Sequence, residues 1–133
     1  MAIYFADTSF WVAIVDQRDA YHSKSIEWSQ NISGTIITTE AVLLETANTF
    51  SRPNWRPKVI GLINHIHSRG DVEIVYKAWQ LAWDLFTQRP DKAWSLTDCI
   101  SFVVMQEKGI TDALAADIHF QQAGYRALLL EAQ

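Results

Sequence analysis

The chain alternates short apolar runs with longer amphipathic stretches. The apolar runs predict strands at residues 2–6, 34–38, 72–76, 110–117 and 125–130. Between them, apolar residues recur at helical spacing, which predicts helices at residues 9–15, 22–31, 39–52, 55–69, 77–88, 97–109 and 118–124. Strands that alternate with helices favour a parallel sheet joined by right-handed crossovers. We therefore expect a three-layer α/β/α fold around a central parallel sheet of four to five strands.

One apolar stripe predicts a buried aromatic face. Trp79, Ala82, Trp83 and Phe86 recur at helical spacing within residues 77–88. This periodicity is typical of a helix that packs its apolar side against a core. We therefore expect the aromatic residues of this helix to be core residues.

Length and composition limit the classes of protein that fit the chain. Its 133 residues, 49% hydrophobic and 20% charged, fit a single soluble domain, residues 1–133. No apolar run reaches the roughly 18 residues of a membrane span, and the amino terminus lacks the basic segment of a signal peptide. The single cysteine, Cys99, has no Cys or His partner and is expected to be a small buried residue, and the four His residues lack zinc spacing. We expect a cytoplasmic protein with no membrane partner.

The charges are unevenly distributed, although the net charge is only −4. No acidic residue occurs between Glu45 and Asp71, and this gap contains four cations and a tryptophan: Arg52, Trp55, Arg56, Lys58 and Arg69. Such a stretch could bind RNA, with the cations on phosphates and the indole stacked on a base. The alternative is a solvated helix face on which the indole packs over a turn.

Four acidic residues are predicted to meet at one edge of the sheet. Asp7 follows the first strand and Asp117 follows "ALAA", so both lie near carboxyl ends of strands, where ligands bind in open parallel sheets. Asp98 begins a helix expected to start at the same edge, and Glu45 lies about two turns into another. Taken singly, the three aspartates could be helix caps and Glu45 a surface residue. Capping does not explain the position of Glu45.

A cluster of carboxylates has a chemical consequence. Carboxylates repel one another unless a cation joins them, and oxygen ligands select Mg²⁺ or Mn²⁺. Such ions activate water and neutralise phosphate charge, which suits phosphodiester hydrolysis. Without metal, at least one acid should titrate abnormally high. A signalling module of the response-regulator type also carries acids at strand ends. It needs a lysine after its last strand, and "YRALLLEAQ" contains none.

Four motifs in order resemble those of PIN-domain ribonucleases, especially the VapC-type toxins: "ADTSFWVAIVDQRDAYH", "TTEAVLLETANTF", "SLTDCISFVVMQEKGI" and "ALAADIHFQQAGY". The resemblance covers nearly the whole chain and implies a PIN-like fold. It implies an acidic quartet that binds Mg²⁺ or Mn²⁺ and cleaves RNA to leave a 5′-phosphate and a 3′-hydroxyl. The quartet maps onto Asp7, Glu45, Asp98 and Asp117, and nearby hydroxyls are expected at Thr8, Ser9 and Thr97.

The resemblance also implies protein partners. Family members form homodimers and are blocked by a cognate antitoxin whose tail occupies an apolar groove, which Trp11 and Trp28 could line. Two alternatives stay open: a PIN nuclease that processes RNA without an antitoxin, and a catalytically silent PIN module that binds partners.

Several polar residues compete for site roles. Asp112 is a rival for the fourth acidic position, but it begins its predicted strand and so lies away from the carboxyl-end edge. Asp16, Asp19 and His22 are expected to be turn and capping residues.

Overall fold

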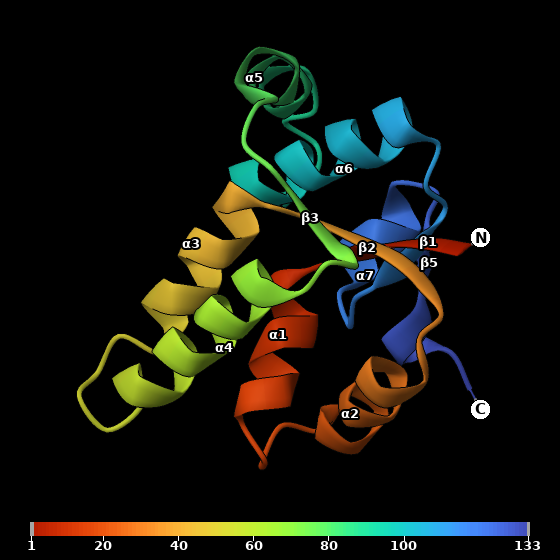
Figure 1. Ribbon diagram of the computed structural model, residues 1–133. Helices are drawn as coiled ribbons and strands as arrows, with labels where there is room; N and C mark the ends of the chain where they lie inside the picture. Colours follow the sequence, from red (N-terminus) through yellow and green to blue (C-terminus); the bar gives the residue numbers. More distant parts are fainter. Residues whose placement is uncertain (1, 133) are drawn as a thin grey trace.

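The computed structural model describes residues 2–132 and contains a sheet of five parallel strands (Figure 1). The strands are β1 (Ala2–Ala6), β2 (Gly34–Thr39), β3 (Val72–Val75), β4 (Asp112–Leu114) and β5 (Arg126–Ala127). Their order in the sheet is β3-β2-β1-β4-β5, and every neighbouring pair is parallel. The predicted α/β/α fold around a parallel sheet is therefore confirmed.

Helices cover both faces of this sheet. They are α1 (Thr8–Val15), α2 (His22–Asn31), α3 (Glu40–Thr49), α4 (Arg56–Ser68), α5 (Trp79–Gln88), α6 (Leu96–Lys108) and α7 (Ile118–Gln122), with a short 3₁₀ helix η1 (Leu128–Leu130) after β5. Right-handed crossovers place α1 to α4 on one face and α5 to α7 on the other; in Figure 1, α5 and α6 lie above the strands and α1, α2 and α4 below them. Within residues 2–132, no helix is both long and apolar enough to cross a membrane.

The strand order reverses at β1, which lies between β2 and β4. The chain runs from β1 through β2 to β3 and then crosses back to β4 and β5. In open parallel sheets, ligands bind outside the carboxyl ends of the strands at such a reversal. The backbone N–H of Asp7 donates to the Leu114 carbonyl at 3.1 Å, which ties the two strand ends together. The topology therefore places the ligand-binding edge at Asp7.

The core lies between the central strands and the helices on either side. Its largest fully buried side chains include Phe5 on β1, Ile36 on β2 and Leu114 on β4. Aromatic residues extend this core on the α6–α7 side, where the rings of Phe102 and Phe120 meet edge to face with centroids 5.0 Å apart. Cys99 is fully buried, as expected. Helices α6 and α7 are thus anchored to each other by packing.

Trp11 is not available to line a groove, and that prediction is wrong. It is only 1% exposed, and its indole N–H donates to Thr38 Oγ1 at 3.4 Å. Its helix, α1, turns this side toward the sheet. Trp28 on α2 is half-buried and packs edge-on against Tyr4, with centroids 5.7 Å apart. Only Trp28 of this pair could contact a partner.

The prediction that the α5 aromatic residues belong to the core is also wrong. Trp79 is 60% exposed, Trp83 42% and Phe86 39%, and their rings stack in a row on the surface. The one buried residue of α5 is Ala82. The helix packs on α6 through this small residue, and no element within residues 2–132 covers its aromatic side.

Two predicted strands are shorter in the structure. The strand predicted at residues 110–117 is confined to β4, and the Ala115 carbonyl accepts the Leu129 N–H at 3.2 Å outside the strand ladder. The strand predicted at residues 125–130 is β5 followed by η1, whose Leu128 and Leu129 are buried. The apolar run reflects burial, which a 3₁₀ turn satisfies as well as a strand does.

Candidate active site

Asp7 joins the end of β1 to the start of α1. As N-cap of α1, its Oδ2 accepts the Ser9 backbone N–H at 3.2 Å and the Ser9 hydroxyl at 2.7 Å. The side chain is buried, with 4% of the residue exposed. Capping therefore explains how Asp7 is held, while its position at the strand reversal places it on the ligand-binding edge.

The two residues after Asp7, Thr8 and Ser9, both carry hydroxyl groups, and that of Ser9 binds the Asp7 carboxylate. Ser9 Oγ also accepts the Ala116 backbone N–H at 2.9 Å, so one hydroxyl connects Asp7 to the segment that precedes Asp117. Thr8 is buried, and its Oγ1 has no hydrogen-bond partner within the described part of the chain. Ser9 thus fixes Asp7 relative to the end of β4.

Asp98 lies in the first turn of α6 and is buried. It forms a capping box with Ser95: the Asp98 N–H donates to Ser95 Oγ at 2.9 Å, and the Ser95 N–H donates to Asp98 Oδ2 at 3.1 Å. The same Oδ2 lies 2.9 Å from His119 Nδ1. The cap fixes the direction in which the carboxylate leaves the helix.

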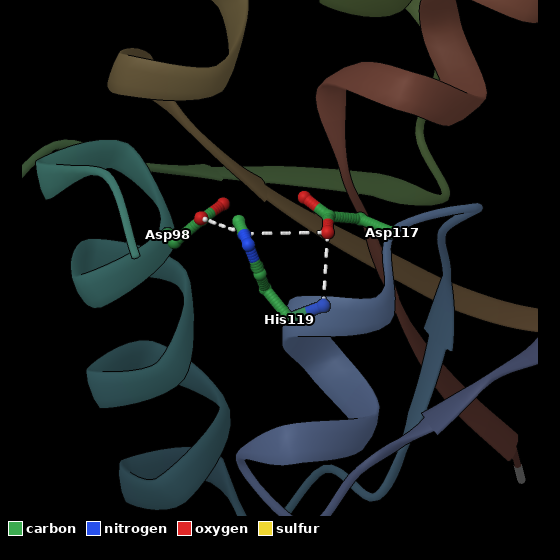
Figure 2. Close-up of side chains that lie close together, drawn as sticks. All are labelled: Asp98, Asp117 and His119. Atoms are coloured by element: carbon green, nitrogen blue, oxygen red, sulfur yellow. Dashed lines mark hydrogen bonds and ion pairs between the residues drawn. The ribbon is translucent and has the colours of Figure 1, made fainter. Parts of the chain in front are cut away.

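Asp117 caps α7 and meets Asp98 through His119 (Figure 2). Asp117 Oδ1 accepts the His119 backbone N–H at 2.9 Å and lies 3.3 Å from the ring Nδ1. One ligand atom each from Asp98, Asp117 and His119 lie within 4.8 Å of one another, a spacing that could hold a metal ion. His119 is a residue that the sequence reasoning missed. Its signal was an Asp followed two residues later by a His at a predicted helix start.

The electrostatics of the site show that the aspartates lie close together. The pKa of Asp7 is raised to about 7, mainly by burial, with smaller contributions from the charges of Asp98 and Asp117 and against the Ser9 hydrogen bonds that lower it. Burial also raises the pKa of Asp98, with a contribution from Asp117 and opposition from Ser95 and His119. The expectation that an acid titrates high is confirmed. Its main cause, however, is desolvation rather than repulsion.

Glu45 lies in a neighbouring groove and does not belong to the group of Asp98, Asp117 and His119. It is half-buried on α3, and the groove is lined by Ala41, Leu44, Glu45, Asn48, Thr49 and Thr97. Thr97 directly precedes Asp98, so this groove adjoins the aspartates. The structure thus brings Asp98 and Asp117 together and places Asp7 near enough to feel the charge of both, while Glu45 shares a groove with Thr97, the residue before Asp98.

The predicted basic rim is not one surface. Arg52, Arg56 and Lys58 lie in the loop before α4 or in its first turn, which Figure 1 shows at the tip remote from α6 and α7. Arg69 is at the other end of α4, roughly 20 Å away at 1.5 Å per residue, and pairs with Asp71 at 2.6 Å. Trp55 packs against Phe50 with the ring planes tilted by 38° and the centroids 5.1 Å apart.

The remaining polar residues have structural partners. Asp112 begins β4 and pairs with Arg126 at 3.4 Å, at the opposite end of the strand from Asp117. Asp16 and Asp19 accept backbone N–H groups of Arg18 and Tyr21 in the turn after α1. His22 Nδ1 lies 2.6 Å from the Ala13 carbonyl. The expectation of turn and capping roles for Asp16, Asp19 and His22 is therefore confirmed.

The donor set at the sheet edge fits a hard divalent cation. It consists of carboxylate oxygens, the ligands that Mg²⁺ and Mn²⁺ prefer. Within residues 2–132, no Lys or Arg forms a salt bridge with Asp7, Asp98 or Asp117. A buried carboxylate without a cationic partner is costly in its ionised form. A bound cation would supply the missing charge.

Comparisons with known proteins agree with this architecture. The 23S rRNA-specific endonuclease VapC20 of Mycobacterium tuberculosis is 28% identical over 129 residues, which cover 91% of this chain and 94% of that protein. The crystal structure of Mycobacterium tuberculosis VapC20, described as a sarcin–ricin loop cleaving toxin, superposes with a TM-score of 0.85 at 28% identity and covers 93% of this chain and 97% of that one. A model of the PIN domain matches residues 4–124. The chain therefore belongs to the PIN-domain family.

Proposed function

We propose that this protein is a metal-dependent endoribonuclease of the VapC type, the toxin of a type II toxin–antitoxin pair. The observation that carries the proposal is the cluster of Asp7, Asp98 and Asp117 at the strand reversal. Its position on the ligand-binding edge of a PIN fold supports phosphodiester hydrolysis. The similarity to a protein named as an rRNA endonuclease supports RNA as the substrate.

Asp7, Asp98 and Asp117 would hold Mg²⁺ or Mn²⁺, with Glu45 contributing from the adjoining groove. When bound, the ion would activate a water molecule and neutralise charge on the phosphate. Ser9 and Ser95 hold the carboxylates in place, and Thr97 lies where it could contact RNA beside Glu45. Thr8 offers a buried hydroxyl next to Asp7. Hydrolysis would leave a 5′-phosphate and a 3′-hydroxyl.

The relative's name suggests a substrate class. VapC20 is described as cleaving the sarcin–ricin loop of 23S rRNA, so a structured rRNA hairpin is the first substrate to test here. Arg52, Arg56 and Lys58 could contact RNA phosphates remote from the cleaved bond, with Trp55 beside them. Arg69 would contribute less because Asp71 neutralises it. We further propose a cytoplasmic homodimer that a cognate antitoxin inhibits.

The test is cleavage of a 23S rRNA fragment that contains this hairpin, with Mg²⁺, Mn²⁺ or EDTA. We expect cleavage with either metal and none with EDTA. Asp112→Asn is the matched control, because it removes a carboxylate from the other end of β4 and should cleave like wild type. Cleavage that continues with EDTA, or in Asp7→Asn, would contradict the proposal. A scrambled hairpin tests the substrate separately.

A further inference from the structure

The three clustered aspartates share one arrangement of hydrogen bonds. In each, one carboxylate oxygen is held by protein donors: Oδ2 of Asp7 by Ser9, Oδ2 of Asp98 by Ser95 and His119, and Oδ1 of Asp117 by His119. The other oxygen of each accepts no hydrogen bond within residues 2–132. Each side chain is therefore fixed by one oxygen and keeps the second available for a ligand.

His119 is the residue that organises two of these three side chains. Its backbone N–H holds Asp117 Oδ1 at 2.9 Å, and its ring Nδ1 lies 2.9 Å from Asp98 Oδ2 and 3.3 Å from Asp117 Oδ1. Ionised carboxylates only accept hydrogen bonds, so Nδ1 carries the hydrogen in this arrangement. A single ring thus bridges α6 and α7, which are separate in sequence.

The free oxygens of Asp98 and Asp117 point into a common space. Figure 2 shows both above the imidazole and turned toward each other, between the start of α6 and the start of α7. Without the ring, Asp98 Oδ2 would keep only the Ser95 N–H, and the carboxylate could rotate. The two negative side chains would then also face each other without a donor between them.

We propose that His119 is a positioning residue. It holds one carboxylate oxygen of Asp98 and one of Asp117 by hydrogen bonds, so that the other oxygen of each side chain faces a shared cation. The proposal rests on the metal-dependent function above. In this role Nδ1 of His119 does not bind the ion. For it to do so, its hydrogen would have to leave, and its hydrogen bond to Asp98 and its contact with Asp117 would be lost. Mutation of partners that hold metal-ligating residues typically lowers metal affinity or activity.

The test is Mn²⁺ binding, measured by calorimetry and by the electron paramagnetic resonance of bound Mn²⁺. We expect His119→Ala to weaken binding by about 10- to 100-fold. His119→Asn places an amide nitrogen where Nδ1 lies and should restore most of the affinity. His119→Gln places its amide farther out and should resemble His119→Ala. His67→Ala, an exposed histidine on α4, is the control and should bind like wild type.

The outcomes separate this proposal from the one on which it rests. If wild type binds Mn²⁺ and cleaves RNA, but His119→Ala binds Mn²⁺ equally well, the positioning role is wrong and the proposed function stands. Coupling of the bound Mn²⁺ to a ¹⁴N nucleus that disappears in His119→Ala would show direct ligation and would also overturn it. If wild type neither binds Mn²⁺ nor cleaves RNA, both proposals fail. An unchanged circular dichroism spectrum for each variant excludes loss of fold as the cause.

Discussion

The two ends of β4 carry aspartates that the protein compensates in different ways. Asp112 at the amino end pairs with Arg126, which also pairs with Glu131 at 2.7 Å. Asp117, beyond the carboxyl end, lies near Asp7 and Asp98. The ring of His119 lies within ion-pair distance of Asp98 and Asp117, and it carries a positive charge only if it is protonated. At the amino end of β4 the protein thus neutralises its acids with its own Arg126. At the other end it gathers acids, and we propose that a bound cation supplies the neutralising charge there.

The largest expected effect of this difference is on RNA cleavage. Asp7→Asn, Asp98→Asn and Asp117→Asn should each lower the cleavage rate by about 10²- to 10³-fold, the usual cost of removing a group that stabilises transition-state charge. Asp112→Asn should leave the rate unchanged, because its carboxylate faces Arg126. Single-turnover cleavage of the rRNA hairpin measures all four. Equal losses at Asp112 and Asp117 would show that the two ends are not functionally distinct.

The second effect is a dependence of stability on pH. The folded-state pKa of Asp7 is about 7, above its ordinary value of 3.8, so between these pH values the folded state binds more protons than the unfolded state. Without metal, the contribution of Asp7 to stability is therefore best below about pH 4, falls as the pH rises to about 7, and is constant above that. The total fall is at most about 4 kcal/mol.

Asp7→Asn removes this dependence, because Asn can still accept the Ser9 N–H but cannot ionise. At pH 8 without metal, the variant should therefore be more stable than wild type, and at pH 4 the two should be similar. Urea unfolding at a series of pH values gives the difference in the free energy of unfolding. A difference that is constant across pH 4–8 would mean that Asp7 titrates normally and is not desolvated.

Mn²⁺ should offset this loss of stability in wild type. A ligand that binds only the folded state at one hundred times its Kd stabilises the protein by about 2.7 kcal/mol. Thermal unfolding at pH 8 should show a higher Tm with Mn²⁺ for wild type and for Asp112→Asn. Asp117→Asn should show little change. An equal rise in all three proteins would locate the bound ion elsewhere.

The sequence was sufficient to locate the aspartates because backbone topology alone brings strand ends together. Asp7 and Asp117 each follow an apolar run, and parallel strands place such positions at one edge whatever the side chains do. His119 could not be found in this way. Its role depends on how α7 packs beside α6, and an Asp-x-His pair has no established ligand spacing in a single sequence.

The α5 helix shows a second limit of sequence reasoning. Periodicity identified correctly that Trp79, Trp83 and Phe86 share a face, but it does not indicate what covers that face. The helix packs through Ala82, and the aromatic rings stack on one another at the surface. The predicted basic rim shows the same limit. The lack of acidic residues between them grouped Arg69 with Arg52 in the sequence. In the structure the length of α4 separates the two residues, and Asp71 neutralises Arg69.

The smallest expected effect concerns Glu45, which stands outside the aspartate cluster in the adjoining groove. Its side chain makes no hydrogen bond within residues 2–132, so Glu45→Gln should keep the fold. If the three aspartates hold the cation, as we propose, Glu45→Gln should weaken Mn²⁺ binding less than Asp117→Asn does, by about tenfold or less. Cleavage should still fall if the RNA contacts Glu45 and Thr97 in the adjoining groove, as we propose.

Glu40→Gln is the control for Glu45, since it makes the same chemical change at an exposed position in the first turn of α3. Titration calorimetry with Mn²⁺ and cleavage of the same hairpin compare the two variants. If Glu45→Gln binds Mn²⁺ as weakly as Asp117→Asn does, Glu45 is a full member of the metal site. A movement of α3 toward α6 would then bring its carboxylate to the ion. Cleavage equal to that of Glu40→Gln would instead reduce Glu45 to a helix surface residue. The three aspartates would then be the whole acidic site, and the groove that begins at Thr97 would lie outside it.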